Sequence, residues 1–314
     1  MKKIVITGGL GFIFSHVTER FIRSGYEVMV IDNLSTGSHP ELVNEFKSLS
    51  CDSNISKPRF QFVKHDVSFQ SVVHHIVNFN PNYIVHAAAI SDVDYSIKQP
   101  VKTIQANNNG TINVFEAARL CRNLEKLLYV STDEVYGECD HPKTEDEIIF
   151  PKNPYSISKA FGSLLRLGYD NTYPELKDKT VETRFCNVFG ERQDDRKIIP
   201  AIKRALDGGK PVVLHNGGEG YRQYIHVSEI PPIIEMLLEV GSRTYNVTAG
   251  EGYTVNALIE KAEAITKQRV FTKAGKRSGM DMRYEMSSQR LRKELGWKPK
   301  KSFEEFFTEY LCQQ

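Results

Sequence analysis

The first 32 residues constrain the fold more than any other part of the chain. An apolar run, 4–7, leads directly into Gly8-Gly9-Leu10-Gly11, and an amphipathic segment follows. A second apolar run then ends on Asp32. A strand, a glycine turn, a helix and a second strand that ends in a carboxylate form the pattern of a dinucleotide-binding unit. The pattern predicts a Rossmann-like α/β fold whose ligand lies at the carboxyl ends of the strands.

Each part of this unit has a physical role toward a dinucleotide. Gly8 permits the tight turn, and Gly11 lets the backbone approach a pyrophosphate at the positive start of the helix. Asp32 can bind the adenosine ribose hydroxyls and would repel a 2'-phosphate, so we expect NAD and not NADP. Phe14 stands where a third glycine is usual, and its ring must either turn away or push the helix outward. The alternative is a structural glycine turn that binds nothing.

Short β-branched apolar runs alternate with longer amphipathic stretches from Lys3 to about Asn187. This alternation predicts a doubly wound parallel sheet with helices on both faces. The predicted strands are 4–7, 27–32, 60–64, 83–87, 126–131 and 180–187, and the predicted helices are 11–24, 40–49, 68–78, 101–120 and 154–173.

The spacing of apolar residues changes after Asn187, which predicts a smaller C-terminal α/β substrate lobe. A helix is expected over 198–206, and the segment 222–239 is expected to return to the large domain. We therefore expect a dinucleotide-binding domain of residues 1–187 plus about 222–248. The substrate lobe would contain residues 188–221, approximately, plus 249–314.

Composition excludes several classes of protein. The 314 residues include 41 Lys and Arg against 39 Asp and Glu, without a charged block, so we expect no nucleic-acid partner. No apolar run reaches the roughly 18 residues of a membrane-spanning helix, so no membrane association is expected. The five cysteines and nine histidines show no metal-binding spacing. The cysteines therefore favour free thiols and a cytoplasmic location, and we expect no metal site.

A tyrosine and a lysine lie one helical turn apart in the predicted helix 154–173. Tyr155 and Lys159 therefore share a face of that helix. A nearby ammonium stabilises a phenolate, so we expect the pKa of Tyr155 to fall below its free value of about 10. The tyrosine could then take a proton from a sugar hydroxyl while hydride leaves the same carbon. The spacing also occurs by chance in amphipathic helices, but here it follows a dinucleotide unit.

Two neighbouring acids, Asp133 and Glu134, follow Thr132 where a central strand is expected to end. One carboxyl group can act as a base and the other as an acid, which is what the elimination of water requires. An isolated acidic pair would otherwise be a solvated part of the surface.

With these residues, the chain resembles the extended short-chain dehydrogenases/reductases of the NAD-dependent epimerase/dehydratase family. Within that family it is most similar to the dTDP-glucose 4,6-dehydratases. The resemblance rests on motifs spread from Ile4 to Pro299. These motifs are Ser131-Thr132-Asp133-Glu134-Val135-Tyr136-Gly137, His86-Ala87-Ala88-Ala89, the segment 92–97, Asn153-Pro154-Tyr155 with Lys159, and the segments 184–190, 277–284 and 294–299.

The resemblance implies a reaction on a nucleotide-bound hexose in three stages. The 4-hydroxyl is oxidised with NAD, water is lost across C5 and C6, and hydride returns to C6. Tyr155 would deprotonate the 4-hydroxyl with help from Lys159 and Thr132. Glu134 would remove the C5 proton, and Asp133 would protonate the departing hydroxyl. The product would be a 4-keto-6-deoxy sugar.

The resemblance also implies two sets of binding residues and a homodimer formed through the helices 101–120 and 154–173. The cofactor set is Gly8, Gly11, Phe12, Ile13, Asp32, Asn33, Asp66, Val67, Ala87, Ala88, Tyr155 and Lys159. The substrate set is Ser91, Asn187, Lys197, Arg222 and Arg283. Gln223 stands where an acid is usual and Met280 where a histidine is usual, so the sugar and the nucleotide, of dTDP or UDP type, stay open.

Two other functions are compatible with the sequence. A nucleotide-sugar 4-epimerase needs the Tyr-Lys pair but has no use for the Asp-Glu pair. A regulatory protein could keep the fold and bind a nucleotide sugar and NAD without efficient catalysis, if Phe14 weakens cofactor binding.

Overall fold

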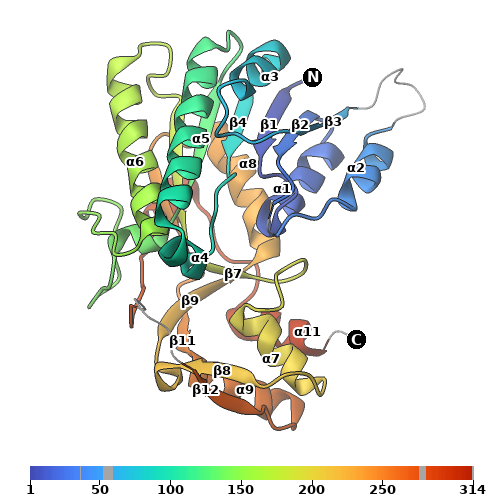
Figure 1. Ribbon diagram of the computed structural model, residues 1–314, viewed down its shortest axis with the longest axis vertical. Helices are drawn as coiled ribbons and strands as arrows, with labels where there is room; N and C mark the ends of the chain where they lie inside the picture. Colours follow the sequence, from blue (N-terminus) through green and yellow to red (C-terminus); the bar gives the residue numbers. More distant parts are fainter. Residues whose placement is uncertain (36, 52–58, 276–280, 313–314) are drawn as a thin grey trace.

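The computed structural model describes residues 1–35, 37–51, 59–275 and 281–312. Its main sheet has seven parallel strands in the order β10-β6-β5-β4-β1-β2-β3 (Figure 1). The strands are β1 (Lys3–Thr7), β2 (Glu27–Asp32), β3 (Phe60–Lys64), β4 (Tyr83–His86), β5 (Lys126–Thr132), β6 (Thr180–Phe185) and β10 (Thr244–Val247). The doubly wound α/β fold predicted from the sequence is confirmed.

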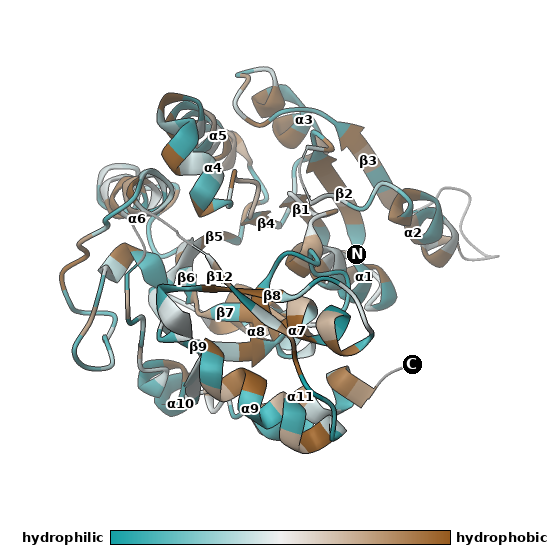
Figure 2. Ribbon diagram, turned by 60° about the horizontal axis from the view of Figure 1, so that its bottom comes forward, coloured by the Kyte–Doolittle hydropathy of each residue, from teal (hydrophilic) through white to brown (hydrophobic). Residues whose placement is uncertain are grey.

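Helices cover both faces of this sheet, which explains why its strands are almost continuously apolar. In β1, Ile4 and Ile6 belong to one core and Val5 to the other. One core contains residues of α1 (Phe12–Arg23), α2 (Leu42–Ser50) and α8 (Ile230–Val240). The opposite core contains residues of α3 (Val72–Phe79) and α5 (Pro100–Leu120). The helix α6 (Pro154–Thr172) packs against α5, and the short helix α4 (Val93–Lys98) contacts both. Figure 2 shows strands of the main sheet in the brown of apolar residues and helices that alternate between brown and teal.

The strand order reverses between β4 and β1, because the chain fills the sheet outward in both directions from this pair. Such a switch point leaves a crevice at the carboxyl ends of the two strands, where doubly wound proteins bind their ligands. The carboxyl ends of β1 to β5 and the chain segments that follow them contain the cofactor and catalytic residues expected from the sequence.

A second group of elements packs below the carboxyl ends of the main sheet (Figure 1). It contains a three-stranded sheet of β7 (Asn187–Phe189), β9 (Tyr221–His226) and β11 (Gly252–Thr254). It also contains a parallel pair, β8 (Val212–His215) with β12 (Thr272–Gly275). A separate core joins these strands to α7 (Ile198–Leu206), α9 (Val255–Thr266) and α11 (Phe303–Cys312).

One strand boundary differs from the predictions. The predicted strand 180–187 is interrupted, since β6 ends at Phe185 and β7 begins at Asn187 in another sheet. The return to the large domain at 222 stays a prediction: β9 pairs with β7 and β11, whereas its residue Ile225 packs in the main core. The apolar pattern of β9 showed a strand but could not show which partner it pairs with.

The return to the main sheet occurs later, through α8 and β10. The helix α10 (Gln289–Leu295), which we expected in the substrate lobe, instead contacts β10. Leu291 and Trp297 belong to the main core as well. We therefore propose a two-lobe division in which 227–248 and about 286–297 accompany the large domain.

The structure shows how the glycine loop accommodates Phe14 in place of a third glycine. Its ring turns into the main core and is 6% exposed. Close packing of α1 on β2 is provided by Gly9, where a Cβ would lie 2.7 Å from Cγ2 of Val30 and 2.9 Å from Oγ1 of Thr18. Thr18 also donates a hydrogen bond to the carbonyl of Gly9 at 3.0 Å. The chain thus has the close-packing glycine at another position of the loop.

Replacement of Phe14 by alanine should therefore lower the free energy of unfolding by about 3–5 kcal/mol, because it leaves a cavity in the main core. Urea unfolding of the NAD-free protein measures the effect. The control is Phe271→Ala, since Phe271 is 62% exposed and its truncation should change stability by less than about 0.5 kcal/mol. Equal stability of F14A and F271A would contradict the inward position of the ring.

Candidate active site

The turn after β1 forms a cradle against the segment after β4. Gly8 has φ of +70°, and a Cβ there would lie 2.9 Å from the backbone of Ala88. The hydroxyl of Thr7 accepts hydrogen bonds from the amides of Ala87 and Ala88, each at 3.2 Å. The same oxygen lies 2.8 Å from Nδ1 of the buried His86. The floor of the crevice is therefore fixed by hydrogen bonds between the two central strands.

The helix α1 begins at this cradle. Its N-cap is Gly11, and no side chain in the described ranges caps it. The amides of Phe12 and Ile13, in the first turn of the helix, have no partner within the helix itself. They lie at the positive end of its dipole. This arrangement fits a pyrophosphate, which accepts such hydrogen bonds and carries negative charge.

Asp32 is held at the end of β2 by three donors. Its carboxylate accepts hydrogen bonds from the amide of Leu10 at 3.2 Å, the amide of Leu34 at 2.9 Å and the hydroxyl of Ser38 at 2.9 Å. The carboxylate is thereby placed beside the glycine loop, where a ribose is expected. A second phosphate on that ribose would face this negative charge.

Asn33 and Asp66 join the ends of β2 and β3. The amide group of Asn33 donates to Asp66 at 2.9 Å, and the backbone amide of Ser68 donates to it at 2.8 Å. Burial alone would raise the pKa of Asp66, but these hydrogen bonds lower it overall. Val67 packs against α5 at Gly110, where a Cβ would lie 2.7 Å from Cγ2 of Val67.

Lys159 lies on α6 with 4% of its surface exposed. Its ammonium lies 4.4 Å from the centre of the Tyr129 ring, whose hydroxyl donates to the carbonyl of Lys159 at 3.0 Å. This close approach requires Gly162, where a Cβ would lie 2.1 Å from the Tyr129 hydroxyl oxygen. Within the described part of the chain, the ammonium donates no hydrogen bond, so a ligand hydroxyl can accept one.

Burial lowers the pKa of Lys159 to about 7, and the negative charge of Glu182 opposes this effect. Glu182 is itself buried in an ion network on β6. Its carboxylate lies 2.9 Å from Nε of Arg184 and 3.6 Å from Nε of Arg166, and it accepts a hydrogen bond from Ser163 at 2.6 Å. This network was not predicted from the sequence, because charged residues in a strand do not indicate which residues they pair with.

Tyr155 stands in the first turn of α6, which begins after Asn153. The side chain of Asn153 accepts from the amide of Ser156 at 2.8 Å, and Ser156 reciprocates, which forms a capping box. Burial, Glu134 and Asp133 raise the pKa of Tyr155, while its hydrogen bond with Thr132 opposes them. The expected lowering of this pKa is therefore wrong for the protein alone, because the phenol is buried and two acids face it.

The acidic pair follows β5 in a short 3-10 helix, Asp133–Tyr136. Thr132 donates to Asp133 Oδ1 at 3.1 Å and accepts from the amide of Glu134 at 3.3 Å. Asp133 is 5% exposed, and its Oδ2 atom is buried without a hydrogen-bond partner among the described residues. Burial and the charge of Glu134 raise the pKa of Asp133 to about 7, although Arg222 lowers it.

Glu134 differs from its neighbour. It is only partly buried, and its carboxylate accepts a hydrogen bond from the side-chain amide of Asn153 at 2.8 Å. A hydrogen bond to a carboxylate stabilises the charged form. The pair therefore contains one carboxyl group that retains its proton to about neutral pH and one whose carboxylate accepts a hydrogen bond from Asn153.

Arg222 lies near the acidic pair, as its effect on the pKa of Asp133 shows. Its guanidinium lies 4.3 Å from the centre of the Tyr284 ring and donates to the carbonyls of Tyr221 at 2.7 Å and Asp281 at 2.7 Å. The hydroxyl of Tyr284 donates to the carboxylate of Asp281. The charge of Glu134 also acts on Tyr284, so this tyrosine belongs to the same site.

The other predicted substrate residues are less closely gathered. Arg283 pairs with Glu285 and lies over the ring of Tyr221. Ser91, Asn187 and Lys197 are exposed: they stand after β4, in β7 and at the N-cap of α7, respectively.

Two further side chains support the site through hydrogen bonds. Asn107 of α5 was not predicted; it bonds both backbone groups of Ile90 and donates to Ser158 at 2.9 Å. Gln223 donates to the carbonyl of Gly250 at 3.0 Å and accepts from the amide of Met286 at 2.9 Å. An ionised acid could not donate the first of these bonds, which explains the amide at position 223. Met280 lies outside the described residues.

Comparison with known proteins agrees with this geometry. The family model described as GDP-mannose 4,6 dehydratase matches residues 5–310. The chain is 32% identical over 316 residues to a trifunctional UDP-glucose 4,6-dehydratase/3,5-epimerase/reductase of Arabidopsis thaliana, covering 97% of this chain but 46% of that protein. The chain thus spans about half the length of this relative. It is 30% identical over 335 residues to the dTDP-glucose 4,6-dehydratase of Salmonella typhimurium, covering 96% and 90% of the two chains.

Solved structures show the same fold. The dTDP-glucose 4,6-dehydratase DesIV of Streptomyces venezuelae, solved with NAD, superposes with a TM-score of 0.88 at 27% identity, covering 98% of this chain and 95% of that chain. The UDP-glucose 4-epimerase of Thermotoga maritima superposes with a TM-score of 0.87 at 28% identity, covering 98% and 97%. The chain therefore belongs to the GDP-mannose 4,6 dehydratase family, within the extended short-chain dehydrogenases/reductases that include NAD-dependent epimerases and dehydratases.

Proposed function

We propose that the protein is an NAD-dependent nucleotide-sugar 4,6-dehydratase, a hydro-lyase that acts on an NDP-hexose of the dTDP- or UDP-glucose type. The observation that carries the proposal is the acidic pair at the end of β5. Asp133 is buried, holds its proton to about pH 7 and has an unpartnered Oδ2 atom among the described residues. An epimerase has no need for a buried carboxylic acid beside a carboxylate base.

The cofactor residues would hold NAD from three sides. The amides of Phe12 and Ile13, after Gly8 and Gly11, would bind the pyrophosphate. The carboxylate of Asp32 would bind the adenosine ribose. The segments containing Asn33, Asp66 and Val67, and Ala87 and Ala88, would line the cleft, and Lys159 would donate to the nicotinamide ribose. NAD bound there would supply the hydride acceptor for C4 of the sugar and, once reduced, the hydride donor for C6.

Three side chains of the site would each carry out a different proton transfer. Tyr155, held by Thr132, accepts the proton of the 4-hydroxyl once positive charge stabilises its phenolate, and Lys159 is the cation on the same helix face. Glu134 removes the proton at C5, which the 4-ketone makes acidic, and returns a proton to C5 when hydride adds at C6. Asp133 gives its proton to the 6-hydroxyl as that group leaves as water. The raised pKa of Asp133 supports its role as the proton donor.

The nucleotide of the substrate would lie toward the smaller lobe. Arg222 and Lys197 can supply positive charge to its diphosphate, and Asn187 and Ser91 can supply hydrogen bonds. Arg283 would help to close the site from the segment 281–285. A panel of dTDP-, UDP-, GDP- and CDP-hexoses, followed by mass spectrometry for the loss of water, identifies the substrate.

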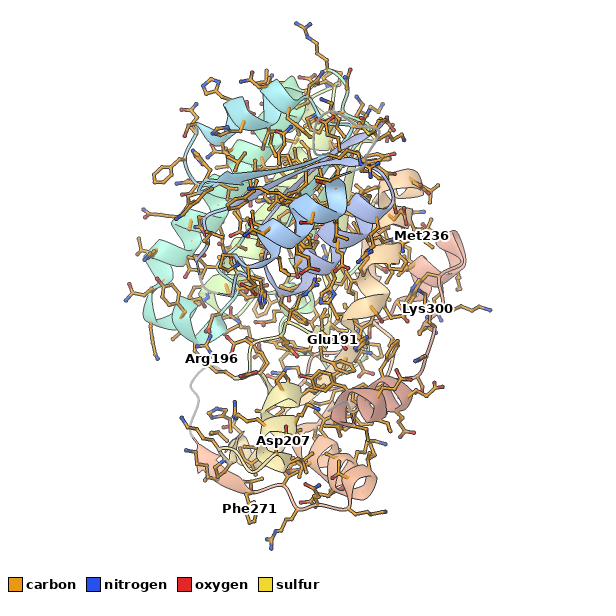
Figure 3. All side chains as sticks on the ribbon, turned by 90° about the vertical axis from the view of Figure 1, so that its right-hand side faces the viewer. Glu191, Arg196, Asp207, Met236, Phe271 and Lys300 are labelled. Atoms are coloured by element: carbon orange, nitrogen blue, oxygen red, sulfur yellow. The ribbon has the colours of Figure 1, made fainter. Side chains whose placement is uncertain are left out.

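Replacement of Asp133 by asparagine should reduce the rate of water loss by about 100- to 10,000-fold, because the amide cannot donate a proton to the leaving hydroxyl. Mass spectrometry of the preferred NDP-hexose measures the product. Asp207→Asn, at the exposed end of α7 in the smaller lobe (Figure 3), is the matched control and should keep full activity. Turnover by D133N close to that of D207N, with formation of the C4 epimer, would instead establish a 4-epimerase.

The same substitution should stabilise the protein in a pH-dependent way. The pKa of Asp133 rises from 3.8 to about 7 on folding, so the stability that its protonation supplies is present at acidic pH and is lost as pH rises to about 7. D133N removes this loss and should gain about 2–4 kcal/mol over the wild type between about pH 4 and pH 8. Urea unfolding at both pH values tests this, with D207N as the control. A pH-independent difference would refute the buried acid.

We also propose that the protein is a cytoplasmic homodimer. Its five cysteines are free thiols, as in a reducing compartment. Among the described residues, no helix has the length and apolar character needed to cross a bilayer. The adjacent helices α5 and α6 expose large apolar side chains that a second copy could cover. These are Val101 and Leu120 on α5, and Ile157, Leu164 and Leu167 on α6.

An arginine at position 164 should convert the dimer into monomers, since Leu164 is 60% exposed in the middle of this apolar stripe. Sedimentation velocity at micromolar concentration measures the oligomeric state. Phe271→Arg, a substitution of another exposed side chain in the smaller lobe, should leave the dimer intact. A dimeric L164R protein would show that α6 is not the interface.

A further inference from the structure

The chain between β7 and α7, residues 191–197, leaves the smaller lobe after β7, contacts the large domain and returns to the smaller lobe at α7; we call it the strap. Figure 3 places Glu191 and Arg196 between the large domain above and the smaller lobe below. Arg192 has φ of +67°, a left-handed conformation that is unfavourable for a side chain with a Cβ. Such a conformation persists only where surrounding contacts hold it.

The first contacts of the strap are with α1. Nε2 of His16 lies 3.0 Å from the carbonyl oxygen of Glu191, and burial lowers the pKa of His16, so a neutral ring donates this bond. The guanidinium of Arg192 lies 2.9 Å from Oε2 of Glu19 and donates to the hydroxyl of Ser15 at 3.3 Å. All three partners follow the glycine loop on the helix that begins at the cofactor cradle.

A second contact is with the segment after β2. Nε2 of His39 lies 2.9 Å from the carbonyl oxygen of Arg192. The backbone amide of His39 donates to the carbonyl of Leu10 in the glycine loop at 2.8 Å. His39 thus joins the strap to the loop that carries the candidate adenosine site.

The third contact is with the segment after β4. The guanidinium of Arg196 binds Asp194 at 2.6 Å and lies 4.0 Å from Oδ2 of Asp92. Asp92 is the N-cap of α4, so its side chain is fixed by a hydrogen bond from the amide of Tyr95 at 2.9 Å.

These three contacts lie after β1, β2 and β4, which are the strands on both sides of the switch point. The strap is therefore attached to both walls of the crevice in which a dinucleotide would lie.

We propose that the strap locks NAD in its cleft between catalytic cycles. The proposal rests on the proposed function, in which NAD ends each cycle in its starting oxidation state and has no reason to leave. Arg192 and Arg196 are positioning residues in this scheme, because each acts by holding the strap and not by contact with the reacting atoms.

The rate at which the NAD-loaded protein releases its cofactor tests the proposal. Excess alcohol dehydrogenase with ethanol converts released NAD to NADH, whose absorbance gives the release rate without any nucleotide sugar. Arg192→Ala should release NAD about tenfold faster than the wild type, as expected for the loss of a charge-assisted hydrogen bond. Arg196→Ala, at a side chain that is 67% exposed, should fold normally and accelerate release by about threefold.

Arg23→Ala is the matched control. Arg23 binds Oε1 of the same Glu19 carboxylate at 2.9 Å but lies outside the strap, so R23A should release NAD at the wild-type rate. Release by R192A and R196A at the rate of R23A would overturn the strap and leave the proposed dehydration intact. Faster release by the strap variants of a protein that dehydrates no sugar on the panel would overturn the proposed function alone.

Discussion

Burial of ionisable groups at the carboxyl ends of the central strands is the constraint on which the candidate site depends. It raises the pKa of Asp133 and lowers that of Lys159, so both groups titrate near neutral pH. It also raises the pKa of Tyr155. Burial therefore shifts the pKa values of a proton donor, a cation and a phenol. The sign of each shift follows from the charge of the ionised form.

Burial of a charged group costs free energy of desolvation, which neighbouring groups of the site offset. The ammonium of Lys159 is held over the ring of Tyr129 and is favoured by the negative charge of Glu182. Glu182 can remain ionised in the core because Arg184 and Arg166 accompany it. The acidic pair has Arg222 as its positive neighbour, and the tyrosine beneath that guanidinium joins the pair to the smaller lobe.

The two lobes are joined at the site and also at the strap. The contacts of Arg222 connect β9 with the segment 281–284 beside the acidic pair. The strap leads into α7. It contacts α1 on one side of the crevice and the N-cap of α4 on the other. A movement of the smaller lobe would thus act on the acids and on the cofactor cleft together. This coupling follows from the topology, since β7 of the smaller sheet directly follows β6 of the main sheet, and β9 leads through a short turn into α8 of the large domain.

The sequence by itself determined the Rossmann-like fold, the carboxylate of Asp32 at the end of a strand, and the Tyr-Lys and Asp-Glu pairs. Each of these features depends on residues that are close together in the chain. Local spacing could not show that β9 belongs to the smaller sheet, that the ring of Phe14 faces the core, or that the acids raise the pKa of Tyr155. Strand partners, burial and electrostatic neighbours come from segments that are far apart in the sequence. Only the tertiary structure brings those segments together, and it therefore decided the protonation states of the candidate site.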